Sequence, residues 1–283
     1  MSSSISELKE YCVQTRRDIL RMVHSAKSGH PGGSLGCTEF MVALYFEIMH
    51  HNYHFSIDGT NEDIFFLSNG HISPVLYSVL ARSKYFPVSE LKTFRRINSR
   101  LQGHPTNHTG LPGVRVASGS LGQGMSVAIG AALSKKINGD ERLVFSLHGD
   151  GEIQEGQIWE AIMYASANKV DNLIATIDVN GRQIDGDTDK VLPMGDISEK
   201  FKVFGWEVIE LKEGNDIERV VEVLNLSKLK ARKNKPVCII MNTEMGNGVD
   251  FMMGTHQWHG IAPNDEQLEK ALEQNPETSL KDY

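Results

Sequence analysis

The stretch HGDGEIQEG, residues 148–156, decides the fold because two closely spaced glycines there join two different hydrophobic patterns. The preceding run RLVFSL, residues 142–147, is short and apolar, as in a buried strand. After it, Ile158, Ile162 and Ala165 recur at helical spacing. The pattern predicts a strand, a glycine-rich turn and a helix in direct succession.

The turn itself has the composition of a ligand site. Gly149 and Gly151 allow positive φ and a close approach of the backbone to a ligand, and Asp150 places a carboxylate at the end of the strand. The helix expected to start near Gln154 would direct free N–H groups to the same region, where they favour an anion. A carboxylate beside an anion requires a cation between them, and Mg²⁺ suits oxygen ligands of this kind.

A second strand end supplies further oxygen ligands. The run NLIATID, residues 172–178, leads into a turn where Asn180 offers an amide oxygen and the backbone near Arg182 offers a carbonyl. Taken alone, Asp150 could instead cap a helix, and Asn180 with Gly181 could form an ordinary turn. Two such strand ends about thirty residues apart favour the magnesium interpretation.

Strands and helices alternate along the rest of the chain. This order predicts an α/β fold with a parallel sheet covered by helices on both faces, and ligands beyond the carboxyl ends of the strands. The expected strands are 63–68, 142–147, 172–178, 206–211 and 236–242, and the expected helices are 74–83, 124–137, 154–169 and 216–230. Two further helices are expected around a turn SGHPGGSLG in the first fifty residues. We expect one domain over 1–283, with a helical tail from about residue 264.

Composition narrows the classes of partner. The chain has 283 residues and a formal net charge of −7, which argues against a nucleic-acid binder. No apolar run approaches the length of a membrane span, and the N-terminus lacks the pattern of a secretory signal. Cys12, Cys37 and Cys238 are odd in number and far apart, as expected of free thiols in the cytoplasm.

Seven segments together resemble the N-terminal, diphosphate-binding part of transketolase, a thiamine diphosphate enzyme, over essentially all of residues 1–283. They are SGHPGGSLG (28–36), SNGH (68–71), GHP (103–105), SGSLGQG (118–124), HGDGEIQEG (148–156), DVNGRQIDG (178–186) and GTHQWHG (254–260). Two positions depart from the family pattern. Ser120 replaces the usual proline, and the turn after Pro31 reads GGSLG, so the donor sugar stays open.

The resemblance implies roles for named residues. The metal ligands would be Asp150, Asn180 and the carbonyl of Arg182, around Mg²⁺ or Ca²⁺. The groups near thiamine diphosphate would be Gly151 and His71 at the diphosphate, and Gly119, Ser120 and Leu121 at the rings. His256 would lie between cofactor and substrate, and His30, His104 and His256 would line the substrate funnel. Glu155 would lie at the subunit interface. Imidazoles suit this task because they exchange protons and hydrogen bonds near neutral pH, although a single loop histidine is more often structural.

The resemblance also implies a missing half. In transketolase, the glutamate that protonates the aminopyrimidine ring and the arginines that grip the sugar phosphate lie in a second domain. We therefore expect a split transketolase. Its partner chain would carry the pyrimidine-binding and C-terminal domains in an α₂β₂ assembly. Such an enzyme transfers a two-carbon ketol unit between sugar phosphates through a thiamine diphosphate ylid.

Other functions stay open at this point. The nearest are a transketolase-like enzyme for another ketose phosphate and a deoxyxylulose-phosphate synthase, which would use pyruvate. A catalytically inert scaffold of the same fold is a different class. A dinucleotide-binding domain is disfavoured because no acidic residue follows a second strand at the ribose-binding spacing.

Overall fold

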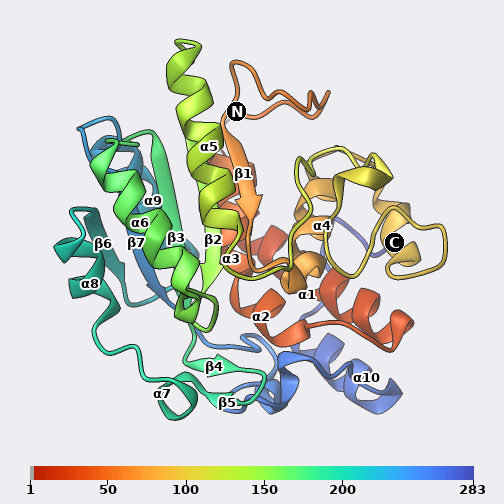
Figure 1. The fold of residues 1–283 in the computed structure, drawn as a ribbon. Helices are drawn as coiled ribbons and strands as arrows, with labels where there is room; N and C mark the ends of the chain where they lie inside the picture. Colours follow the sequence, from red (N-terminus) through yellow and green to blue (C-terminus); the bar gives the residue numbers. More distant parts are fainter. Residues whose placement is uncertain (1–2) are drawn as a thin grey trace.

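A computed structural model describes residues 3–283 and contains a five-stranded, fully parallel sheet (Figure 1). The order across the sheet is β1-β2-β3-β7-β6, and each of these strands falls within or next to a run predicted from the sequence. Their bounds are Ile64–Leu67 for β1, Val144–Gly149 for β2, Leu173–Val179 for β3, Glu207–Leu211 for β6 and Val237–Asn242 for β7. The predicted parallel α/β architecture is confirmed.

Helices cover both faces of the sheet, and the two faces bury alternate strand residues. In β1, Phe65 and Leu67 pack in the larger core, while Ile64 and Phe66 pack in the smaller one. The larger core involves α1 (Ile5–Ala26), α2 (Pro31–Gly36), α3 (Thr38–Ala43), α4 (Ser73–Arg82), α9 (Ile217–Lys230) and α10 (Asp265–Gln274). The smaller core involves α5 (Gly124–Ile137), α6 (Gly156–Ala167) and α8 (Ile197–Val203). Burial on both faces explains why the strands are continuous apolar runs.

The segment expected to be the glycine-rich turn SGHPGGSLG is mostly helical. Its residues from Pro31 onward form α2, because proline is well suited to a first helical position and small residues permit close packing. A Cβ on Gly32 would lie 2.8 Å from the carbonyl oxygen of Trp258, and one on Gly36 would lie 3.0 Å from that of Glu244. The glycines therefore bring α2 against the 244–258 segment.

Three smaller features were not predicted. A short hairpin of β4 (Arg182–Gln183) and β5 (Gly186–Asp187) follows β3 and leads into α7 (Thr188–Val191). The helix α8 was also missed. In addition, α6 begins at Gly156, two residues later than expected, because Glu152–Gln154 forms a separate 3₁₀ turn. Within residues 3–283, no helix is both long and apolar enough to cross a membrane.

Arginines of α1 and α4 hold the C-terminal segment against the larger core. Arg17 Nη2 lies 2.7 Å from Asp282 Oδ2, and its Nη1 donates to the carbonyl of Asn275 at 2.6 Å. Arg82 forms a buried ion pair with Asp18 at 2.9 Å and donates to the carbonyl of Leu280 at 3.0 Å. The last residues are thus part of the folded unit.

The Arg17–Asp282 pair makes a prediction about acid stability. The hydrogen bond from Arg17 lowers the pKa of Asp282 to about 2, below its ordinary value of 3.8. Because the pKa of this carboxyl is lower in the folded state than in the unfolded state, the contact stabilises the fold when the pH is above the unfolded-state pKa. This stabilisation is lost as the pH falls from about 4 to 2. We expect Asp282→Asn to reduce the free energy of unfolding by about 1 kcal/mol at pH 7, after allowing for solvent screening.

Urea denaturation between pH 8 and pH 3 measures this effect. The difference between wild type and Asp282→Asn should be constant down to pH 5 and shrink below pH 4. The control is Glu266→Gln, which removes an exposed ion pair with Lys270 on α10 and should change little. An equal effect of both variants would contradict the role of the Asp282 contact.

Candidate active site

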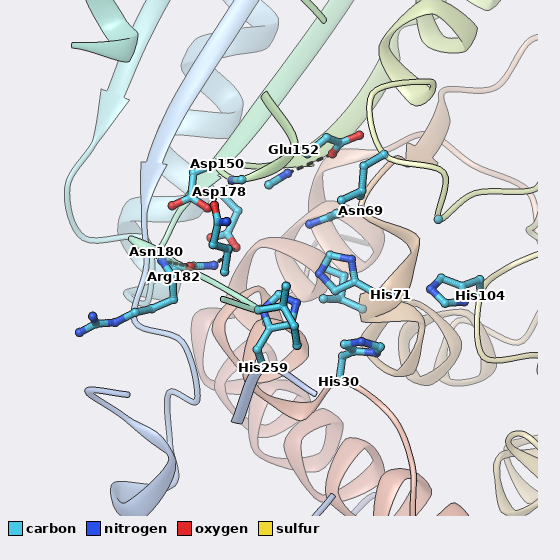
Figure 2. A pocket seen from close by; sticks show the side chains of 18 residues that line it. His30, Asn69, His71, His104, Asp150, Glu152, Asp178, Asn180, Arg182 and His259 are labelled. Carbon is cyan, nitrogen blue, oxygen red and sulfur yellow. Dashed lines mark hydrogen bonds between the residues drawn. The ribbon is translucent and has the colours of Figure 1, made fainter. Parts of the chain in front are cut away.

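A cavity of about 350 Å³ lies beyond the carboxyl ends of β1, β2 and β3 (Figure 2). Asp150, Asp178 and Asn180 lie on one side of it, and His30, His71 and His104 lie on the other. The lining residues are His30, Gly33, Asn69, His71, Ile72, His104, Gly119, Leu121, Gly149, Asp150, Gly151, Glu152, Asp178, Asn180, Arg182, Gln183, Ile184 and His259. This is the edge of the sheet at which the sequence predicted a ligand site.

The pairing of β2 with β3 brings the two predicted turns together. Gly149 is in register with Asp178, and the N–H of Asp150 donates to the carbonyl of Asp178 at 3.1 Å. The Asp150 carboxylate then accepts from the N–H of Gly181 at 2.7 Å and from that of Gly151 at 2.8 Å. Asp150 is therefore fixed between the turn after β2 and the turn after β3.

Asp178 is a second buried carboxylate directly behind Asp150. It accepts hydrogen bonds from the side chains of Asn180, at 2.8 Å, and Thr243. Burial and the neighbouring Asp178 raise the pKa of Asp150 to about 7. Two acids this close, out of water, are unfavourable unless a cation joins them.

The donor set fits a divalent cation that prefers oxygen ligands. The Arg182 guanidinium forms an ion pair with Asp187 and so does not neutralise the buried acids. Within the described residues 3–283, neither Asp150 nor Asp178 has an ion-pair partner. The same residues contain no group of three or more His, Cys, Asp or Glu side chains placed for a metal. One carboxylate, one amide oxygen and a backbone carbonyl are what Mg²⁺ takes when phosphate oxygens and water complete its shell.

Three histidines form a cluster on the opposite wall, with a fourth beside it. The rings of His30, His71 and His259 lie 5.0 to 5.6 Å apart, and His104 lies 6.2 Å from His30. Burial lowers the pKa of His30 to about 4 and that of His71 to about 3. Burial also lowers the pKa values of His104 and His259. The wall therefore presents neutral imidazoles that can both donate and accept hydrogen bonds.

The loop 118–124 closes a third side of the cavity. Gly119 has φ +112°, and a Cβ there would lie 2.4 Å from the His104 ring, so only glycine fits this position. Leu121 is 38% exposed although it is apolar, and it lines the cavity with Ile184, which is 60% exposed. Apolar side chains left open to a cavity suit contact with a flat ring.

Most of the residues singled out from the sequence meet in this cavity. His30, His71, His104, Gly119, Leu121, Asp150, Gly151, Asn180 and Arg182 all line it. Ser120, Glu155 and His256 are exposed and do not line it. The cavity histidine of the GTHQWHG segment is thus His259 in place of His256. The 3₁₀ turn Gln257–His259 turns the later histidine inward.

Other lining residues were not predicted, although each stands in or next to a predicted segment. Asn69 stands in SNGH, Glu152 follows the GDG turn, and Asp178 ends the strand before Asn180. Gln183 and Ile184 belong to the unpredicted hairpin region. The available signal was a polar residue one or two positions from a chosen one, but only the turn geometry decides which of these side chains faces the cavity.

Comparison with known proteins identifies the family of the chain. Residues 9–279 match the family described as transketolase, thiamine diphosphate binding domain. The chain belongs to this family. The predicted membership is confirmed, and the match supports thiamine diphosphate as the ligand of the fold.

Two kinds of transketolase relative differ in length. The chain is 36% identical over 272 residues to an apulose-4-phosphate transketolase subunit of Actinobacillus succinogenes, with 96% of each covered. It is 34% identical to a 6-deoxy-6-sulfo-D-fructose transketolase subunit of Clostridium sp., covering 97% of that protein. The transketolase structure from Campylobacter jejuni superimposes with a TM-score of 0.89 at 33% identity, over 96% of this chain but 43% of the other. The chain therefore spans about two-fifths of that transketolase chain and nearly all of the named subunits.

The histidine wall of this transketolase-family chain makes a prediction about protonation. Because burial lowers their pKa values, His30 and His71 should stay neutral from pH 8 to about 5.5. The pKa of each histidine is lower in the folded state than its value of about 6.5 in the unfolded state. The stability linked to this difference is fully present above pH 6.5 and is lost as the pH falls toward about 4. Histidine-selective ¹H–¹⁵N NMR over this range should show no titration of either ring. A midpoint near 6.5 for either ring would contradict the desolvated cluster.

Proposed function

We propose that this chain is the N-terminal subunit of a split transketolase that moves a two-carbon ketol unit from a ketose phosphate to an aldose phosphate. The chain forms a single diphosphate-binding domain. It is located in the cytoplasm, where its three buried free cysteines stay reduced. The observation that carries the proposal is the division of one cavity into an acidic end and a neutral histidine end. The first suits a metal–diphosphate group, and the second suits the hydroxyls of a sugar.

At the acidic end, the side chains of Asp150 and Asn180 and the carbonyl of Arg182 would hold Mg²⁺, and Ca²⁺ would satisfy the same oxygens. Gly151 and His71 would face the diphosphate. Thiamine diphosphate supplies a nucleophilic carbon and an electron sink once bound. The protein's part is to hold the metal and to exclude water from the buried carboxylates.

Two parts of the chain would form the walls around the rings of the cofactor. Gly119, Ser120 and Leu121 belong to the loop on one side, and Ser120, being exposed, would contribute through its backbone. Ile184, from the β4–β5 hairpin, also lines the cavity. The apolar side chains of Leu121 and Ile184 would contact a flat ring without competing for its polar atoms.

At the histidine end, His30, His104 and His259 would orient the substrate. A neutral imidazole can accept a hydrogen bond from a hydroxyl through one ring nitrogen and donate one to a carbonyl oxygen through the other, and it stays uncharged in both cases. His259 takes the position expected for His256, which would lie at the mouth of the funnel. The three imidazoles could thus bind a sugar according to the arrangement of its hydroxyl groups.

The partner would cover the exposed face of α5 and α6. A groove of about 470 Å³ runs there between Ile129, Leu133, Ala161 and Tyr164. Tyr164 is 51% exposed, and the groove lies on the helices that directly follow the cavity loops. Glu155, at the start of α6, would meet the partner at the same interface. We propose a chain carrying the pyrimidine-binding and C-terminal domains, in an α₂β₂ assembly.

The donor sugar has a second candidate. Two relatives that match over nearly their full length are named for apulose 4-phosphate and for 6-deoxy-6-sulfo-D-fructose. These names favour a donor other than xylulose phosphate, either another ketose phosphate or a related anionic ketose. Product analysis with several ketose phosphates, and with pyruvate as donor, separates these candidates from a deoxyxylulose-phosphate synthase. A chain inert with every donor would favour the scaffold.

Asp150→Ala tests the metal site in the assembled enzyme. The chain is recovered from its native cells by affinity with thiamine diphosphate and Mg²⁺ present, and ketol transfer from xylulose phosphate to ribose phosphate is assayed. We expect a second chain to co-purify and the activity to fall by at least about 100-fold in Asp150→Ala. Loss of a residue that only supports a metal ligand typically lowers activity about 10–100-fold, and loss of a ligand itself should cost more. Calorimetry should show loss of Mg²⁺-dependent cofactor binding.

The matched control is Asp171→Asn, which removes a partly buried carboxylate paired with Lys136 and remote from the cavity. It should retain activity and binding. Robust ketol transfer by the pure, isolated chain would contradict the need for a partner. A co-purifying chain without this reaction would leave the cofactor site in place and reject the sugar.

A further inference from the structure

Glu152 is a buried carboxylate beside the cavity, and neither the metal end nor the histidine wall uses it. It is 2% exposed and begins the 3₁₀ turn Glu152–Gln154, directly after the GDG segment. Figure 2 shows it next to Asn69, above the histidines in this view. A carboxylate buried to this degree is costly unless several donors satisfy it.

Its two oxygens accept from three separate parts of the chain. Oε1 accepts from the hydroxyl of Ser68, just after β1, and from the N–H of Gly122 at 2.9 Å. Oε2 accepts from the N–H of Gly149, at the end of β2, at 3.2 Å. One side chain thus joins the ends of two strands to the loop 118–124.

The same loop is pressed against the sheet by close packing. A Cβ on Gly124 would lie 2.2 Å from Ser68 Oγ, so this residue touches the hydroxyl that Glu152 binds. Gly122 has φ +87°, a conformation that favours glycine, and its N–H donates to the Glu152 carboxylate. The loop carries Gly119 and Leu121 into the cavity, so its distance from the strand ends sets the width of the site.

A buried histidine completes the surroundings of Glu152. His148 is 0% exposed, and its Nδ1 lies 3.7 Å from Glu152 Oε2 while its Nε2 lies 2.9 Å from Ser146 Oγ. Together with the donors from Ser68, Gly122 and Gly149, this imidazole leaves neither carboxylate oxygen of Glu152 without a polar neighbour.

We propose that Glu152 is a positioning residue that fixes loop 118–124 to the carboxyl ends of β1 and β2, and so sets the surface against which the cofactor rings rest. The proposal deepens the proposed function and rests on it. Its action is specific to the ring side of the site, because the metal end is held by Asp150 and the turn after β3 through separate bonds.

The test uses Glu152→Gln in the complex of the chain with its partner. The amide keeps the shape but lacks the charge, and its NH₂ group cannot accept from Gly149. We expect affinity for thiamine diphosphate with Mg²⁺ to fall by roughly tenfold or more, as for other supporting partners of a ligand site. Affinity for inorganic diphosphate with Mg²⁺, which reports on the acidic end alone, should stay unchanged.

Glu62→Gln is the matched control. Glu62 is 5% exposed, pairs with Arg115 and lies just before β1, at the opposite end of that strand from Ser68. It should lower the melting temperature without changing either affinity. Asp150→Ala should lose binding of both probes.

Each outcome decides one point. Equal affinities in wild type and Glu152→Gln, or an equal loss for both probes in Glu152→Gln, would overturn the positioning role. No thiamine diphosphate binding by the wild-type complex would instead reject the proposed function. If Glu152→Gln does not fold, Ser68→Ala removes one donor and keeps the charge. It should weaken only thiamine diphosphate binding, and unchanged binding would overturn the proposal.

Discussion

The hydrogen bond from the N–H of Gly181 to the Asp150 carboxylate joins the two turns on which the whole site depends. It forms because β2 and β3 are parallel neighbours in register, so their carboxyl ends stop at the same level. A parallel sheet leaves its strand ends open at one edge, where loops can converge on a ligand. The acidic end of the cavity follows from that pairing, and the loops of other elements are placed around it.

The two ends of the cavity differ in their electrostatics. At one end, Asp150 and Asp178 are buried close together without an ion-pair partner among the described residues, so this end favours a cation. At the other end, burial keeps His30 and His71 neutral. Desolvation raises the pKa of an acid and lowers that of a base, so one physical effect prepares both ends.

Regular elements and the acidic end were predictable from the sequence, whereas the choice between neighbouring side chains was not. Apolar runs mark the five strands because both sheet faces are buried, and Asp150 and Asn180 follow two of them. The helix α2 was missed because its glycines serve close packing, which local preference does not reveal. His256 was chosen over His259 because a 3₁₀ turn, invisible in the spacing, decides which ring faces inward.

The neutral histidine wall has a consequence for how such enzymes diversify. Among the lining residues that the structure describes, Arg182 is the one arginine or lysine, and it is paired with Asp187. Under the proposed function, such a wall would distinguish sugars by shape and hydroxyl pattern, and the partner chain would have to recognise their anionic end. Exchange of that partner alone would then change the donor sugar while this chain stayed the same.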